Sequence, residues 1–155
     1  AQSNLNTLES ALSSLSLSSE LPAASLKSAD VLAAKYSDGN WYRCKVVGVD
    51  NKRGEARVRF IDYGMDDWVP LRQLTRVPPS VANVPKLATE VSLMHIVVPG
   101  EEDEWAMEAG ETLRQLVYDR DLEVEVVSRA GDGAVTGKAF VDGEDVAALL
   151  LRAGV

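Results

Sequence analysis

The middle of the chain alternates short apolar segments with tight turn signals, and this spacing restricts the fold more than any other feature. Residues 31–36, 41–49 and 55–61 are apolar or alternate in character, and polar, glycine-containing turns lie between them at 37–40 and 50–54. In the last of these segments apolar residues recur at every second position, as in a strand with one buried face. Several strands at such close spacing predict a small β-barrel.

A different pattern follows the prolines of residues 78–85. The apolar run 91–98 predicts a strand buried on both faces. Residues 101–118 have helical spacing, with acidic side chains in the first turn, where the helix dipole favours them. The remaining expected elements are strands at 122–126 and 135–141 and a helix at 144–151. The chain as a whole is therefore predicted to be α+β and rich in strands.

Two of the expected helices have one apolar stripe each. In residues 1–28 leucines recur at intervals of three and four and serines fill the other face, which predicts a docked amphipathic helix near the start. A linker is the alternative for this segment, because its complexity is low. In the helix of 101–118 the expected buried stripe consists of Trp105, Ala109, Leu113, Leu116 and Val117.

Charge and cysteine content restrict the class of function. The 155 residues carry a net charge of −8, and the only basic excess lies in 31–80, where nine basic residues face six acidic ones. A duplex-binding protein normally has an extensive basic face, so this distribution favours cationic partners such as arginine-rich peptides. A single cysteine, Cys44, and no signal-like or membrane-length apolar run predict a cytoplasmic, membrane-free protein, with the nucleus and RNA granules as further locations.

Two segments carry a resemblance to a known family. The sequences AKYSDGNWYRC (residues 34–44) and VRFIDYG (58–64) resemble the first strands and the strand-to-turn signature of Tudor domains in content, order and separation. The leading helix and the elements of 86–155 are similar to half of a staphylococcal nuclease fold. The chain thus resembles an extended Tudor domain, and within that family most of all the C-terminal region of the Tudor staphylococcal nucleases.

The resemblance implies both an architecture and a function. A Tudor (SH3-like) barrel is expected at 29–80 and a partial staphylococcal-nuclease-like (OB-fold) subdomain at 81–155, to which the helix and Ser-rich loop of 1–28 also belong. It further implies a monomeric, non-catalytic domain without cofactor or metal, in an RNA-processing or RNA-silencing protein. The implied partners are arginine–glycine-rich tails with symmetrically dimethylated arginine, such as those of spliceosomal Sm or Piwi-type proteins.

The resemblance also implies a binding site. In this family four aromatic side chains form a cage around a methylated guanidinium, which suits aromatic faces because methylation removes N–H donors and leaves an apolar cation. The positions that match are Tyr36, Tyr42, Phe60 and Tyr63, with Arg43 and Asp62 as a supporting pair. Each ring taken alone is more typical of a barrel core, and the pair alone is more typical of a surface ion pair. The joint pattern favours the cage.

Met65 departs from the family pattern. Many methylarginine readers have an asparagine after the glycine of the signature, which makes a polar contact with the ligand, whereas a thioether cannot donate a hydrogen bond. Met65 is able to pack on the methyl groups, and Asp66 or Asp67 are candidates for the polar contact. The preference between symmetric and asymmetric dimethylation therefore stays open.

The other conspicuous residues have structural interpretations. Trp41 and Trp68 are expected in the core, His95 is expected as a core histidine in an apolar strand, and Cys44 as an inert barrel residue. The acidic run 101–104 lacks metal-loop spacing and is expected to be a solvated helix start.

Two alternative functions stay open. One is single-stranded RNA binding, in which basic residues follow the backbone and aromatic rings stack on bases. The residues that suggest it are Lys45, Lys52, Arg53, Arg57 and Arg59. The other alternative is a structural scaffold with a vestigial cage.

Overall fold

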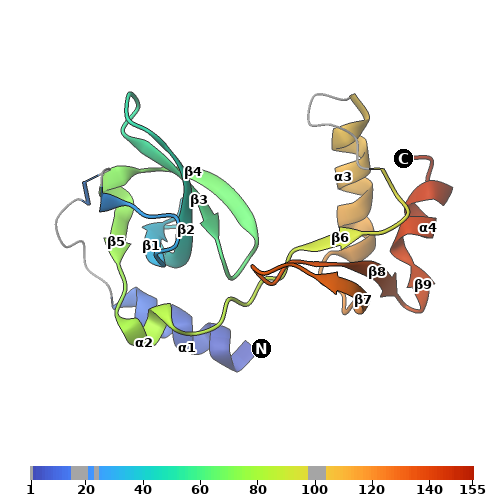
Figure 1. The fold of residues 1–155 in the computed structure, drawn as a ribbon, viewed down its shortest axis with the longest axis horizontal. Helices are drawn as coiled ribbons and strands as arrows, with labels where there is room; N and C mark the ends of the chain where they lie inside the picture. Colours follow the sequence, from blue (N-terminus) through green and yellow to red (C-terminus); the bar gives the residue numbers. More distant parts are fainter. Residues whose placement is uncertain (1, 15–20, 23–24, 98–103) are drawn as a thin grey trace. The chain divides into compact units, whose positions relative to one another are not determined.

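The computed structural model describes residues 2–14, 21–22, 25–97 and 104–155 (Figure 1). The chain forms two compact units, residues 1–88 and 89–155, which are described separately. No helix within the described ranges is both long and apolar enough to span a bilayer. The fold is α+β and rich in strands, as predicted.

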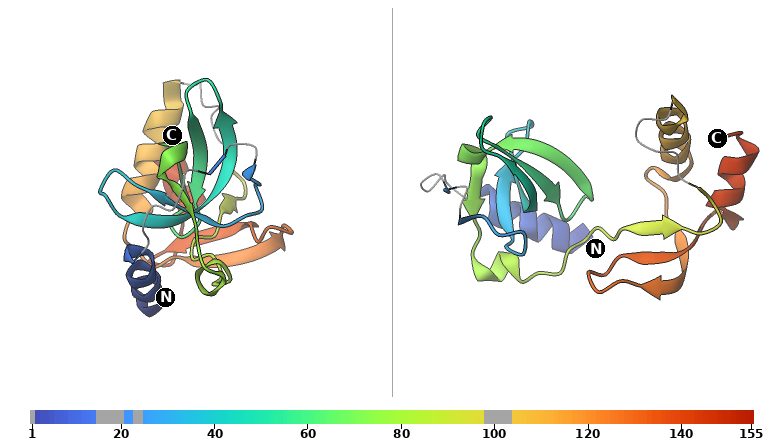
Figure 2. Two further views of the ribbon diagram at one scale, coloured as in Figure 1. Left: turned by 90° about the vertical axis from the view of Figure 1, so that its left-hand side faces the viewer. Right: turned by 45° about the horizontal axis from the view of Figure 1, so that its top comes forward.

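The first unit contains a five-stranded antiparallel sheet that curls into a barrel (Figure 2). The strand order is β4-β3-β2-β1-β5. The elements of this unit are α1 (Gln2–Ser13), β1 (Leu32–Lys35), β2 (Trp41–Asp50), β3 (Glu55–Phe60), β4 (Met65–Pro70), η2 (Leu71–Gln73), β5 (Leu74–Arg76) and α2 (Pro79–Ala82).

The alternation predicted for the third segment is confirmed in β3. Ala56, Val58 and Phe60 are buried in the barrel core, and the arginines between them are exposed. This core also contains Leu32, Ala34, Cys44, Val46, Val69, Leu71 and Leu74.

Helix α1 docks on the barrel, so the linker interpretation is wrong for its residues. Leu8 and Leu12 are buried against Ala33, Trp41 and Val81. The core position predicted for Trp41 is thereby confirmed. These contacts lie within the first unit, and the assignment of 1–28 to an OB-like part stays a prediction.

Trp68, by contrast, is not a core residue. It is 48% exposed, because the register of β3 and β4 pairs it with Arg57 on the outer face of the sheet.

The second unit combines a small sheet with two helices. Strands β6 and β8 are parallel, β7 and β9 pair antiparallel with β8, and the strand order is β6-β8-β7. Val141, Val146 and Leu150 are among the buried residues of its core. The elements are β6 (Val91–Leu93), α3 (Glu104–Val117), β7 (Glu123–Arg129), β8 (Val135–Val141), β9 (Glu144–Asp145) and α4 (Val146–Arg152).

The strand predicted at 91–98 is much shorter than expected. It ends at Leu93, and His95 has a φ of +65°, which directs the chain out of the extended conformation. His95 is exposed, so the prediction of a core histidine is wrong. Residue 98 lies outside the described residues.

The burial predicted for the second unit is only partly confirmed. Leu113, Leu116 and Val117, near the end of α3, pack on the core, but Trp105 in its first turn is 59% exposed. These three side chains are only partly buried, and the packed stripe is restricted to the C-terminal part of the helix. In β7 only Val124 joins the core. Of the acidic run, 101–103 lie outside the described residues and Glu104 begins α3.

Candidate functional site

The turn between β1 and β2 positions two tyrosines. The amide N–H of Tyr36 donates to the carbonyl of Asn40 (2.9 Å), and the N–H of Gly39 donates to the carbonyl of Tyr36 (3.0 Å). Gly39 has a φ of +86°, a conformation that glycine adopts without steric cost. Tyr36 thus precedes a tight turn, and Tyr42 lies at the start of the strand that leaves it.

A second tight turn, between β3 and β4, positions Phe60, Tyr63 and Met65. Phe60 ends β3 and pairs with Met65, the first residue of β4. The amide N–H of Gly64 donates to the carbonyl of Phe60 (2.8 Å), with a φ of +80° at the glycine. Tyr63 is therefore held at the tip of a closed turn.

The four aromatic rings form one connected cluster, in which Tyr42 contacts each of the other three. The ring centroids of Tyr36 and Phe60 are 5.6 Å apart, those of Tyr42 and Phe60 6.1 Å, and those of Tyr42 and Tyr63 5.4 Å. Their interplanar angles of 81°, 85° and 90° are edge-to-face arrangements, which expose the electron-rich face of one ring beside the edge of another.

A cavity of about 120 Å³ lies among these rings. Phe60 is 2% exposed and forms its floor, whereas Tyr63 and Met65, at 47% and 41%, form its rim. All five residues that the sequence singled out for ligand binding line it, although their role in binding stays a prediction. The lining residues are Tyr36, Asp38, Tyr42, Phe60, Tyr63 and Met65.

Asp38 is the one lining residue that the sequence reasoning missed. Its carboxylate accepts hydrogen bonds from the Tyr42 hydroxyl (2.5 Å) and from the Asn40 amide (2.9 Å). The hydrogen bond from Tyr42 is the main cause that lowers the pKa of Asp38, so the group is ionised at neutral pH. The sequence signal that could have identified Asp38 is its position in a glycine-containing turn, four residues before Tyr42.

The tyrosine at the rim is tied to the N-terminal helix. The Tyr63 hydroxyl donates to Oε1 of Glu9 at 3.1 Å. Burial, followed by this hydrogen bond, raises the pKa of Tyr63 to about 12. The ring is therefore a neutral phenol at physiological pH.

The supporting pair is buried rather than superficial. Arg43 is 1% exposed, and its Nε donates to Asp62 at 2.8 Å. The same guanidinium donates to the carbonyl oxygens of Val81 (2.9 Å), Val84 (2.6 Å) and Pro85 (3.1 Å). The surface interpretation of this pair is therefore wrong, and we call the three acceptors the carbonyl cradle.

Neither candidate for the missing polar contact lines the cavity. Asp66 is paired with Arg57 (3.2 Å) and Arg59 (2.7 Å) on the outer face of the sheet. Asp67 accepts a hydrogen bond from the backbone amide of Trp68 (2.8 Å). Asp38 is the carboxylate that reaches the cavity instead.

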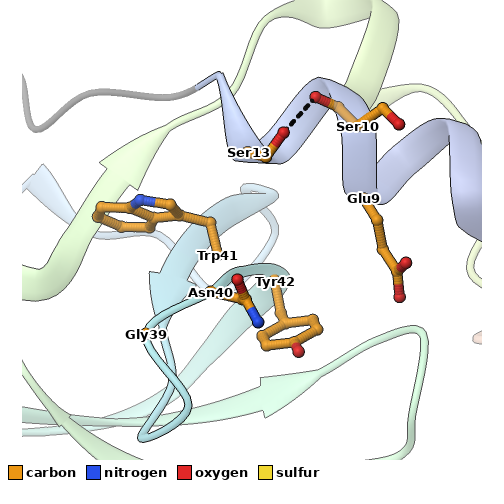
Figure 3. A pocket seen from close by; sticks show the side chains of 7 residues that line it. All are labelled: Glu9, Ser10, Ser13, Gly39, Asn40, Trp41 and Tyr42. Carbon is orange, nitrogen blue, oxygen red and sulfur yellow. Dashed lines mark hydrogen bonds between the residues drawn. The ribbon is translucent and has the colours of Figure 1, made fainter.

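A larger hollow of about 410 Å³ lies beside the cavity, between α1 and the β1–β2 turn (Figure 3). Tyr42 lines both, and the Tyr42 and Glu9 side chains border the same space, whereas Trp41 points away from Tyr42. We call this hollow the helix groove. Its lining residues are Glu9, Ser10, Ser13, Gly39, Asn40, Trp41 and Tyr42.

The chain has relatives among known proteins. The model of the Tudor domain family matches residues 1–95. The chain belongs to the Tudor family. It is 32% identical over 171 residues to "Ribonuclease TUDOR 2" of Arabidopsis thaliana, a match that covers 90% of this chain and 17% of that protein. It is 34% identical over 79 residues to the Drosophila melanogaster staphylococcal nuclease domain-containing protein 1. This match covers 50% of this chain and 8% of that protein.

Solved structures extend the likeness to both units. The extended Tudor domain of human TDRD1, crystallised with a symmetrically dimethylated peptide, is 25% identical with a TM-score of 0.79, covering 98% of this chain and 76% of that one. The extended Tudor domain of Drosophila Tudor-SN is 27% identical with a TM-score of 0.78, covering 98% and 72%. This Tudor chain thus has the extended Tudor fold, the fold of a binding module.

The chain spans only a small part of the curated relatives that it matches. It corresponds to 17% of "Ribonuclease TUDOR 2" and 13% of "Ribonuclease TUDOR 1" from the same plant. Activities of those whole proteins are therefore not carried over to this domain.

Proposed function

We propose that this domain reads dimethylated arginine on a partner protein, with the cavity among Tyr36, Tyr42, Phe60 and Tyr63 as an aromatic cage. The observation that carries the proposal is the convergence of four aromatic rings around one cavity. The extended Tudor domain of human TDRD1, crystallised with a symmetrically dimethylated peptide, supports it.

The cavity suits a methylated guanidinium physically. Such a cation keeps its charge but loses donors to methyl groups, so ring faces compensate for lost hydration. Each well-placed ring contributes about 0.5–2 kcal/mol, and three or four rings give micromolar affinity after ordering costs. Asp38, at the cavity wall, supplies an acceptor for a remaining N–H and a complementary charge.

Titration of a peptide with symmetric dimethylarginine, an asymmetric counterpart and a plain arginine peptide tests the proposal. We expect tighter binding of the methylated peptides and a loss of about 5- to 30-fold for Tyr63→Ala, because one wall is removed. Trp68→Ala is the matched control, since Trp68 is equally exposed but lies on the outer sheet face. Equal affinity for methylated and plain peptides refutes the assignment.

The proposal makes the domain a binding module rather than an enzyme, in an RNA-processing or RNA-silencing protein of the cytoplasm. Sm-type and Piwi-type tails are the proposed partners, because they contain arginine–glycine repeats. The test is whether the purified domain cleaves single-stranded RNA or DNA in the presence of a metal ion. Cleavage that is abolished by replacing one of its carboxylates would contradict the absence of catalysis.

A further inference from the structure

We propose that the helix groove holds a second, cationic side chain of the same peptide, an arginine close to the one in the cage. This inference rests on the proposed function and adds a second subsite to it. Its starting point is that Tyr42 is a wall of both hollows, so the groove adjoins the cage and lies within reach of residues next to the one that fills it.

The lining of the groove selects for positive charge. None of the seven described residues that line it is basic, and Glu9 contributes a carboxylate that is exposed to solvent. Oε1 of Glu9 accepts the Tyr63 hydroxyl, and the other carboxylate lone pairs remain for a ligand. The same hydrogen bond fixes this carboxylate at the rim of the cage.

Neutral acceptors complete the subsite. Nδ2 of Asn40 donates to Asp38 (3.2 Å), which leaves the Asn40 side-chain oxygen as an acceptor. The Ser13 hydroxyl donates to the carbonyl of Ser10 (2.8 Å) and keeps its own lone pairs. A guanidinium has five N–H donors and no acceptor, so it matches a wall of acceptors better than an anion or an apolar side chain does.

In arginine–glycine repeats the arginines alternate with glycine, which sets the distance between neighbouring arginines. An extended peptide advances about 3.3 Å per residue, and side chains two residues apart lie on the same face, roughly 7 Å from one another. The two hollows share Tyr42 as a wall, so they adjoin each other. We therefore place the second arginine two residues from the methylated one.

A cycle of protein and peptide changes tests the subsite. One glycine-rich peptide has symmetric dimethylarginine with an arginine two residues away on each side, and the other has glutamine at both flanking positions. We expect the wild type to prefer the first by about threefold to tenfold at 0.15 M salt, and Glu9→Gln to lose most of this preference. Glutamine retains an oxygen that accepts the Tyr63 hydroxyl, so the cage wall stays supported.

Two further variants separate the subsite from general electrostatics. Glu55→Gln also removes one negative charge, but at the first residue of β3, at the opposite end of the strand from Phe60. We expect this variant to keep the preference for the arginine-flanked peptide. Ser10→Glu adds a carboxylate to the groove, and we expect it to increase the preference. Thermal unfolding of each variant verifies that α1 remains docked.

The outcomes distinguish this inference from the proposed function. If Glu9→Gln keeps the full preference, or weakens both peptides equally, the subsite is refuted while the cage stands. If the wild type does not distinguish dimethylarginine from plain arginine in the first peptide, the proposed function itself fails.

Discussion

Met65 is the residue at which this cavity departs most from the pattern of methylarginine readers. It lies on the rim, 41% exposed, where an amide would have both a donor and an acceptor for the ligand. We expect Met65→Asn to strengthen binding of dimethylarginine peptides by about fivefold, the value of one added hydrogen bond. Calorimetric titration measures the change.

Met65→Leu provides the control for that prediction. Leucine keeps the volume and the apolar character but lacks sulfur, and we expect its affinity to equal that of the wild type. A similar gain for both variants would show that sulfur is unfavourable and that no polar contact was missing.

Cys44 is a second residue with a clear expectation. It is buried in the middle of β2, between Leu32 and Phe60 on the neighbouring strands, and burial raises the pKa of its thiol to about 12. The reactive thiolate is therefore scarce at pH 8 as well as inaccessible. We expect alkylation by iodoacetamide to be slow in the native protein and fast in urea. Equally fast labelling without urea would contradict the burial.

The site residues were predicted from the sequence only as a joint pattern. Tyr36, Tyr42, Phe60 and Tyr63 were matched by their order and separation, and the structure places all four around one cavity. The pairing of Asp66 with arginines on the outer sheet face could not be predicted, because strand register decides which neighbours a side chain meets.

At the level of elements, β8 contains the closest backbone approach among the described glycines of the second unit. A Cβ atom added to Gly137 would overlap the carbonyl oxygen of Glu125 in β7. We expect Gly137→Ala to destabilise this unit by about 3 kcal/mol or more, because backbone atoms of a paired strand cannot move aside easily. Urea unfolding followed by circular dichroism measures the loss.

Gly131→Ala is the matched variant for this experiment. Gly131 lies in the β7–β8 turn, and a Cβ there meets no atom within 4 Å. We expect a change of about 0.5 kcal/mol or less. If Gly137→Ala unfolds at the same urea concentration as this variant, the close approach has no energetic importance.

Elements with a regular period were the ones that the sequence predicted well. The alternation in β3 and the helical stripe of α1 each have a single buried face, so the pattern reveals the burial. The prediction of a strand over 91–98 was wrong because apolar character alone does not fix an extended backbone. The chain turns at His95, which has a positive φ. The predicted burial of Trp105 was wrong because the core contacts only part of α3.

At the scale of the whole molecule, the net charge of −8 should influence how fast ligands arrive. We expect the association rate constant of an arginine-rich methylated peptide to fall several-fold between about 0.02 and 0.5 M salt, because screening removes the attraction. The affinity ratio of methylated to plain peptide should change little. Stopped-flow mixing measures the rates.

The same experiment with single-stranded RNA examines the alternative function. Two of the residues that suggested RNA binding, Arg57 and Arg59, form ion pairs with Asp66. We therefore expect weak RNA affinity at physiological salt. Tight binding that declines steeply with the logarithm of salt concentration would instead favour an RNA-binding domain.

The carbonyl cradle of Arg43 has a consequence for the growing chain during synthesis. The arginine lies in β2, but its acceptors at Val81, Val84 and Pro85 are 38 to 42 residues further along. At about 5–20 residues per second, a ribosome needs roughly 2–8 seconds to add them. The rest of β2, β3 and β4 are made within that interval, so four strands of the barrel exist before the guanidinium has all of its acceptors. We therefore expect the nascent barrel to stay accessible to chaperones and proteases until residues 81–85 have been added.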